Sequence, residues 1–137
     1  MDLATIFLLH KVAEIFALLC MLAGVSMALF FRKNRSWLKI HRLFNSTSVF
    51  FLFAGICVAF FVINQQEGEH IAGFHPAIGA ITLLIAFLAL IFGFYHLRAK
   101  NKIRARMIHR LLGYMALLSI IIALISGLVH AGIISIV

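Results

Sequence analysis

Histidine is the residue of this chain best suited to bind a metal centre, and it recurs at regular places. Four histidines stand near the starts of four successive apolar segments, at His10, His41, His75 and His109. A neutral imidazole offers one ring nitrogen to a metal while the other ring nitrogen forms a hydrogen bond. These four positions therefore predict ligand chemistry, provided that the segments fold so as to bring the rings together.

Glycine accompanies these histidines at fixed spacings. Gly24 and Gly55 each follow their opening histidine by 14 residues, and Gly93 and Gly127 follow theirs by 18. In a helix, both spacings return to within about 40° of the starting face, roughly 21–27 Å further along. Each segment is thus predicted to carry a ligand at one depth and, on the same face at the opposite depth, a residue without a side chain.

The third and fourth segments repeat one another at an offset of 34 residues. Each opens with HxxxG, carries a late glycine and closes with a second histidine. The matched positions are His75 with His109, Gly79 with Gly113, Gly93 with Gly127, and His96 with His130. Because Gly79 and Gly113 lie one turn after their opening histidines, they predict open space beside the ligands themselves.

The composition places these segments in a membrane. The chain has 137 residues, 64% of them hydrophobic, and a mean hydropathy of +1.13. Apolar runs at about 4–31, 40–63, 74–97 and 107–134 are each long enough to cross about 30 Å of hydrocarbon as a helix. We therefore predict an all-α membrane protein, a four-transmembrane-helix antiparallel up-down bundle that forms a single domain over residues 1–137.

The net charge of +8 is concentrated in two short loops. Eleven of the twelve Lys and Arg residues fall within residues 32–42 and 98–110, and all four acidic residues lie elsewhere. Loops with this bias stay in the cytoplasm as a rule, so the charge is explained without a nucleic-acid partner. The sequence predicts both termini outside, the two basic loops inside, and the lipid bilayer as the surroundings.

Alternating helix direction sorts the opening histidines into two layers. His10 and His75 fall in the outer layer, and His41 and His109 fall in the inner one. In an up-down bundle, the first and third helices are diagonal, as are the second and fourth. Each layer then offers two facing imidazoles, an arrangement that can hold a haem between two axial ligands. The late glycines would give room to the haem of the opposite layer.

A second pairing stays open. Its ligand pairs are His75 with His130 and His96 with His109, all from the third and fourth helices. The 21 residues from His75 to His96 span about 31 Å of helix, which would push both irons toward the lipid headgroups. It would also leave the first two helices without a role. The histidines without an assigned role are otherwise His70, His96 and His130.

Charged and polar residues beside the ligands are candidates for further haem contacts. Haem propionates favour nearby cations, and the candidates are Lys11 on the outer side and Lys39, Arg42 and Arg110 on the inner side. Glu14 follows His10 by one turn, and Asn45 stands in the same relation to His41. A carboxylate inside a membrane span indicates function by default. Glu14 could accept a hydrogen bond from a ligand ring or take a proton during quinol oxidation, and Asn45 suggests a similar supporting role.

Taken together, these residues resemble the four-helix core of the cytochrome b561 family over nearly the whole chain. The resemblance rests on the opening histidines, the HPAIG and HRLLG starts, the WLKIH stretch before the second helix and the late glycines. It implies two b-type haems, one near each membrane face, with His10 and His75 on the outer haem and His41 and His109 on the inner one. Larger members carry flanking helices or an extracellular redox domain, for which this chain has no residues left. Four-helix prokaryotic relatives match its size better, and they are expected to exchange electrons with quinones or redox proteins.

The resulting expectation is a di-haem b-type cytochrome that transfers electrons across the membrane. The reductant would be a quinol, an ascorbate-like donor or a redox protein, with an acceptor on the other side. A redox protein partner or larger membrane complex is expected, with a homodimer also open, in a prokaryotic plasma membrane. The alternatives are a haem-bearing anchor or assembly subunit of a larger redox complex, and a cofactor-free small transporter or scaffold.

Overall fold

Four long helices make up the computed structural model, which describes residues 3–65 and 73–134. They are α1 (Leu3–Phe30), α2 (Trp37–Gln65), α3 (Phe74–Tyr95) and α4 (Lys102–His130). Each contains a stretch long and apolar enough to cross a membrane. The prediction of an all-α protein with four membrane-spanning helices is confirmed.

The helix ends differ from the apolar runs where capping chemistry takes over. Helix α4 begins at Lys102, five residues earlier than the apolar run, because the Asn101 side chain accepts a hydrogen bond from the Arg104 N–H at 3.0 Å. Lysine and arginine propagate a helix well, so the basic stretch continues from that cap. At the other end, α4 stops at His130 because Gly132 adopts a left-handed φ of 67°.

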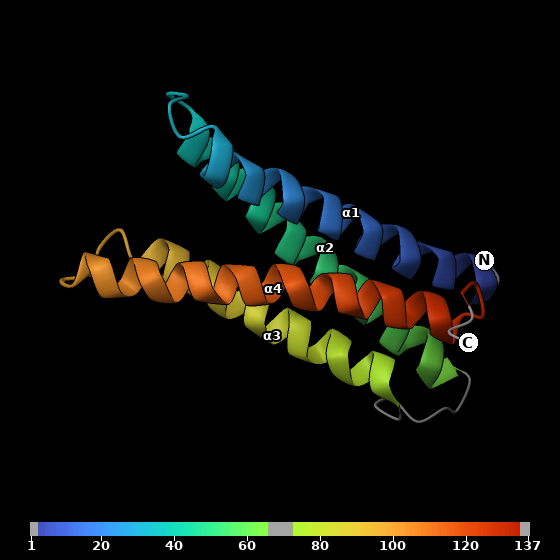
Figure 1. The fold of residues 1–137 in the computed structure, drawn as a ribbon. Helices are drawn as coiled ribbons and strands as arrows, with labels where there is room; N and C mark the ends of the chain where they lie inside the picture. Colours follow the sequence, from blue (N-terminus) through green and yellow to red (C-terminus); the bar gives the residue numbers. More distant parts are fainter. Residues whose placement is uncertain (1–2, 66–72, 135–137) are drawn as a thin grey trace.

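The helices form two antiparallel hairpins, α1 with α2 and α3 with α4, which pack against one another more loosely (Figure 1). Between the hairpins, α2 meets α3 and α1 meets α4, while within the described residues α1 stays apart from α3 and α2 from α4. The diagonal relations predicted from helix direction are therefore present. Figure 1 also shows the hairpins diverging toward one end of the bundle.

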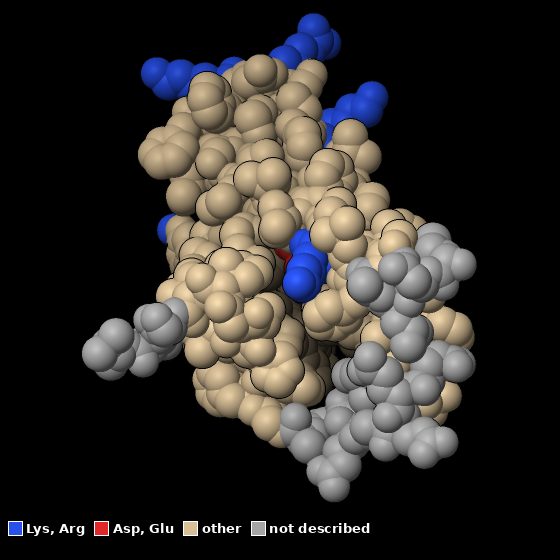
Figure 2. Space-filling model, turned by 90° about the vertical axis from the view of Figure 1, so that its right-hand side faces the viewer, with Lys and Arg blue, Asp and Glu red and all other residues tan. Residues whose placement is uncertain are grey.

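The two ends of the bundle differ in charge. One end carries the connections 31–36 and 96–101, and we call it the basic end; the other holds the start of α1 and the end of α4, and we call it the terminal end. Viewed from the terminal end, the surface is largely uncharged, and it is hollowed beside a basic side chain near its centre (Figure 2). Lys11 is the only Lys or Arg that the sequence places in this half.

A cluster of buried apolar residues joins all four helices at mid-depth. It contains Ala17 and Met21 of α1, Val49 and Leu52 of α2, Ala86 of α3, and Ala116 and Ile120 of α4. Alanine at these positions allows the helix backbones to approach closely, as is usual between membrane helices. The cluster lies between the opening and late positions of each helix, so it separates the two ends of the bundle.

A buried hydroxyl joins α1 to α2. Ser48 is 0% exposed, and its Oγ–H donates to the Ala17 carbonyl at 2.8 Å. We expect Ser48→Ala to lower the free energy of unfolding by about 0.6–1.7 kcal/mol, the size of hydrogen bonds between membrane helices. Unfolding in detergent, followed by circular dichroism, would measure this. Ser46→Ala is the matched control, and equal stability of the two variants would contradict the assignment.

Candidate functional site

The structure brings the four opening histidines together in two pairs, one near each end of the bundle. At the terminal end, the ring centroids of His10 and His75 lie 6.3 Å apart, and at the basic end those of His41 and His109 lie 6.0 Å apart. A metal–imidazole bond of about 2 Å places the centroids of two opposed imidazoles about 6–6.5 Å apart. Both diagonal pairs therefore have the spacing required to hold one metal ion between them.

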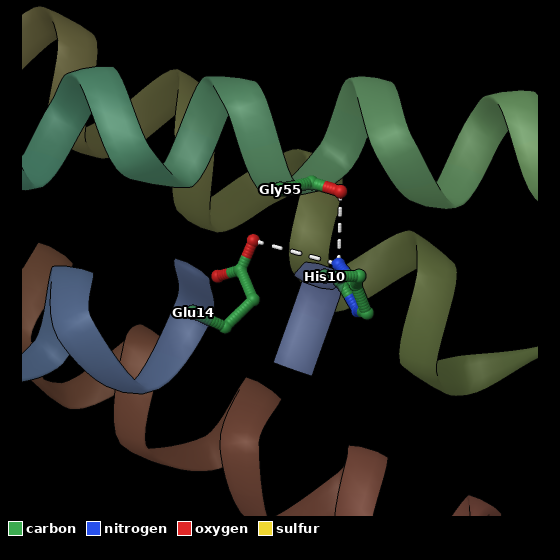
Figure 3. Close-up of polar contacts among 3 residues, drawn as sticks. All are labelled: His10, Glu14 and Gly55. Atoms are coloured by element: carbon green, nitrogen blue, oxygen red, sulfur yellow. Dashed lines mark hydrogen bonds and ion pairs between the residues drawn. The ribbon is translucent and has the colours of Figure 1, made fainter. Parts of the chain in front are cut away.

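The hydrogen bond of His10 fixes which of its nitrogens is free (Figure 3). Its Nδ1 lies 2.9 Å from the carbonyl oxygen of Gly55 on α2, and His10 is 8% exposed. Because a carbonyl oxygen can only accept, Nδ1 must carry the hydrogen. In the neutral ring, the Nε2 of His10 is then unprotonated, which is the form that binds a metal.

His41 and His109 at the basic end are held in the same way. The Nδ1 of His41 lies 2.7 Å from the Gly24 carbonyl oxygen, and that of His109 lies 2.9 Å from the Ala89 carbonyl oxygen. Each ring is thus anchored by the backbone of the other helix in its hairpin. Both Nε2 atoms are free to bind metal by the same reasoning.

His75 is anchored by a side chain, with the Ala123 carbonyl as a further partner of the ring. Its Nδ1 lies 3.0 Å from the hydroxyl oxygen of Ser126 on α4. The Ser126 hydroxyl donates its own hydrogen to the Ala123 carbonyl at 2.9 Å, so toward His75 it acts as the acceptor. All four opening histidines therefore donate through Nδ1 and keep Nε2 available.

The late glycines of α3 and α4 lie against the rings of opening histidines. A Cβ on Gly93 would lie 2.9 Å from Cε1 of His109, and a Cβ on Gly127 would lie 2.8 Å from Cε1 of His75. Distances below about 3 Å are too short for carbon atoms, so these rings occupy the space that a side chain would fill. The sequence predicted the depth of these glycines but not their contact with an imidazole.

The late glycines of α1 and α2 make room for polar neighbours of the ligands. A Cβ on Gly24 would collide with the amide of Asn45, and one on Gly55 would lie 2.5 Å from Oε1 of Glu14. By contrast, a Cβ on Gly79 or Gly113 would meet no atom within 4 Å. The space beside these two glycines is therefore open, while their role in clearing a haem stays a prediction.

Glu14 and Asn45 both lie beside opening histidines, with different contacts. Oε1 of Glu14 is 3.9 Å from Nδ1 of His10, and this buried oxygen has no hydrogen-bond partner within the described residues. The Gly55 carbonyl lies 2.9 Å from the same nitrogen and accepts its hydrogen, while Glu14 lies farther away (Figure 3). The two roles that the sequence left open for Glu14, as an acceptor for a ligand ring and as an acceptor of a proton, stay predictions. The amide nitrogen of Asn45 lies 2.7 Å from the His41 carbonyl oxygen and 3.2 Å from its Nδ1.

A cavity of about 420 Å³ surrounds the pair at the basic end, where the hairpins diverge. His41, His109 and Gly113 line it, together with Arg42 and Arg110. Two further arginines that sequence reasoning missed also line it, Arg32 and Arg106. Arg106 lies one helical turn before His109, and this spacing could have indicated that the two side chains share a face of α4. Lys39 is exposed and does not line this cavity.

At the terminal end, Lys11 and His130 lie near the other pair. The Nζ of Lys11 lies 5.2 Å from the ring centroid of Phe7, and the Lys11 side chain is partly exposed. A cavity of about 430 Å³ between α3 and α4 is lined by His75, Ser126 and His130, among others. His70 lies outside the described residues.

The closing histidines also approach a ligand ring. Ring centroids are 6.0 Å apart for His75 and His130, and 6.4 Å apart for His96 and His109. The spacing alone therefore admits the second pairing. The hydrogen bonds separate the two pairings only at the terminal end, where His10 is anchored and the exposed His130 ring has no hydrogen bond in the described part of the chain. At the basic end, Nδ1 of His96 lies 3.3 Å from the Gly93 carbonyl, so its Nε2 is free in the same way as that of His41.

Each end of the bundle thus brings two imidazole rings of the opening histidines together. Within residues 3–65 and 73–134, no three His, Cys, Asp or Glu side chains gather as a ligand set for a bare metal ion. A metal held by two imidazoles must bring its other ligands with it, as the iron of a haem does. Four membrane-spanning helices with such imidazole pairs define a membrane-bound b-type cytochrome.

A family model described as eukaryotic cytochrome b561 matches residues 26–135, and the chain belongs to that family. It is therefore a haem-b transmembrane electron-transfer protein. No match was found among curated proteins or among solved structures. The matched model is a eukaryotic one, so the expected prokaryotic membrane receives no support. Most of α1, including His10, precedes the matched residues.

Proposed function

We propose that the chain binds two b-type haems and transfers electrons between the two faces of the membrane. His10 and His75 would hold the haem of the terminal end, and His41 and His109 that of the basic end. The observation that carries this proposal is the shared hydrogen bonding of the four rings, which leaves every Nε2 free, in two pairs whose ring centroids lie 6.0 and 6.3 Å apart. When bound, each haem supplies a reversible one-electron centre.

The rest of the chain supports electron transfer at these positions. The mid-depth cluster, which includes Leu52 and Ile120 at 1% exposure, keeps water from the region between the two pairs. Arg42 and Arg110 would face haem propionates at the basic end, joined by Arg32 and Arg106, and Lys11 would do so at the terminal end. With two imidazoles from the protein to hold it, each haem would suit electron transfer better than oxygen binding.

The orientation in the membrane is part of the proposal. The charge bias places the basic end in the cytoplasm and the terminal end outside. A quinol, an ascorbate-like donor or a redox protein would deliver electrons at one end, and an acceptor would take them at the other. A protein partner or a larger membrane complex is proposed with it, because the described helices carry no catalytic site of their own.

Transfer across a sealed membrane tests this function. The purified protein would be placed in liposomes that contain a redox protein as acceptor, with an impermeant reductant added outside. We expect reduction of the trapped acceptor to depend on the protein and to fall to the rate of empty liposomes in His41→Ala, which lacks one ligand of the basic-end haem. Continued transfer by His41→Ala would instead favour an anchoring role for the haems.

A further inference from the structure

The four ligand histidines are not anchored equally. His10, His41 and His109 donate to backbone carbonyls, which no side-chain replacement removes. His75 alone among them has a side chain as its nearest acceptor, the hydroxyl of Ser126 at 3.0 Å, with the Ala123 carbonyl as a further partner of the ring. One ligand of the terminal-end pair is therefore held by a group that a single substitution can alter.

Ser126 is itself fixed in the orientation that this contact needs. Its hydroxyl hydrogen points to the Ala123 carbonyl, 2.9 Å away and one turn earlier in α4, so a lone pair faces Nδ1 of His75. The next residue, Gly127, leaves the space that the same ring occupies, with its hypothetical Cβ 2.8 Å from the ring Cε1. The His75 ring is thus seated on two successive residues of α4, one that accepts a hydrogen bond and one that makes room.

A hydrogen bond at Nδ1 has a chemical consequence for the other nitrogen of the ring. An imidazole that donates through Nδ1 is more basic at Nε2, and a more basic ligand stabilises ferric iron over ferrous iron. Loss of the acceptor therefore raises the reduction potential of the haem that the ring ligates. The ligands at the basic end have carbonyl acceptors, so they keep theirs whatever residue stands at position 126.

We propose that Ser126 is a positioning residue for the haem of the terminal end: its hydroxyl orients His75 and holds down the reduction potential of that haem without affecting the other. The inference rests on the proposed function, since it assumes that His75 ligates a haem. Position 126 is then a place where one residue adjusts the potential of one site and leaves that of the other unchanged.

Redox titration of the purified protein, followed in the visible spectrum, tests this with three variants. In Ser126→Ala, we expect two haems per chain, with one midpoint potential moved upward and the other unchanged. Ser126→Thr keeps a hydroxyl that can still bond to the preceding turn, and it should restore the original midpoint. Ser119→Ala is the matched control: this hydroxyl also donates to a carbonyl of its own helix, at 3.0 Å from Ala116, but has no histidine partner within the described residues.

The electron paramagnetic resonance spectrum gives a second reading, because the signal of each ferric haem reports on the orientation of its own ligand rings. The signal of one ferric haem should change in Ser126→Ala, and the signal of the other should not. If the alanine variant does not accumulate, Ser126→Cys replaces the oxygen by a weaker acceptor of similar size and should shift the same midpoint upward. Unchanged midpoints in the variants that lack the hydroxyl, or the same shift in Ser119→Ala, would overturn the inference. A wild-type protein without haem would instead overturn the proposed function.

Discussion

Replacing His10 by alanine is expected to leave one haem per chain in place of two. His10 supplies one of the two nitrogens at the terminal end, and its Nδ1 hydrogen bond to Gly55 holds the ring with Nε2 free. A haem with a single protein ligand loses half of its axial coordination and the orientation that comes with it. The pigment content of the purified variant, measured by extraction of the haem, gives the number directly.

His130→Ala is the matched comparison for His10→Ala, because both rings lie close to His75. Their ring centroids are 6.0 Å from His75 for His130 and 6.3 Å for His10, so distance alone does not separate them. Hydrogen bonding and burial distinguish the two residues, because His10 is anchored and buried while His130 is exposed. We expect His130→Ala to keep both haems. Loss of one haem in His130→Ala with two retained in His10→Ala would establish the pairing within α3 and α4 instead.

Gly93→Ala is expected to weaken haem binding at the basic end by about 10–100-fold. Its Cβ would lie 2.9 Å from Cε1 of His109 and 3.1 Å from Nδ1, so the ring must move away from the position in which Ala89 holds it. Overpacking of this kind costs about 1–3 kcal/mol, and each 1.4 kcal/mol is about tenfold in affinity. Titration of haem into the haem-depleted variant would measure the change.

Gly113→Ala tests whether a methyl group at this position would clash with the haem, because it would not clash with the protein. A Cβ there would meet no protein atom within 4 Å, although Gly113 lines the same cavity as Gly93. The haem-depleted variant should therefore be as stable as the wild type, and its affinity for haem should still fall if the haem lies beside this glycine. Wild-type affinity in Gly113→Ala would show that the predicted clearance is wrong at this position, while leaving the expectation for Gly93→Ala unaffected.

The positions of the histidine pairs follow from the sequence because they depend on few physical facts. Helix length and alternating direction place His10 and His75 at one depth and His41 and His109 at the opposite depth. Short connections make the two helices of each pair diagonal in the bundle. Helical periodicity places Gly24 at the depth of His41 in the same manner. The predicted start of the fourth helix was five residues too late, because hydropathy does not detect the hydrogen-bonded cap at Asn101.

The anchoring of the rings could not be predicted, because its acceptors are mostly backbone carbonyls. A carbonyl oxygen is present at every residue, so Gly55 and Ala89 carry no signal of this role in their residue type. Ser126 has a side chain, but a serine in an apolar helix usually bonds to the backbone of the preceding turn. Ser126 does form that bond, with the Ala123 carbonyl, so its residue type did not indicate the contact with His75. The divergence of the two hairpins likewise depends on packing over whole helices.

The number of haems in the purified wild-type protein tests the central claim most directly. Haem extracted from a preparation made in haem-replete cells, divided by the protein determined by amino-acid analysis, gives the ratio. We predict two b-type haems per chain, each with the spectrum of iron held by two imidazoles. A colourless preparation, or one haem per chain that persists in both His41→Ala and His10→Ala, would contradict the account.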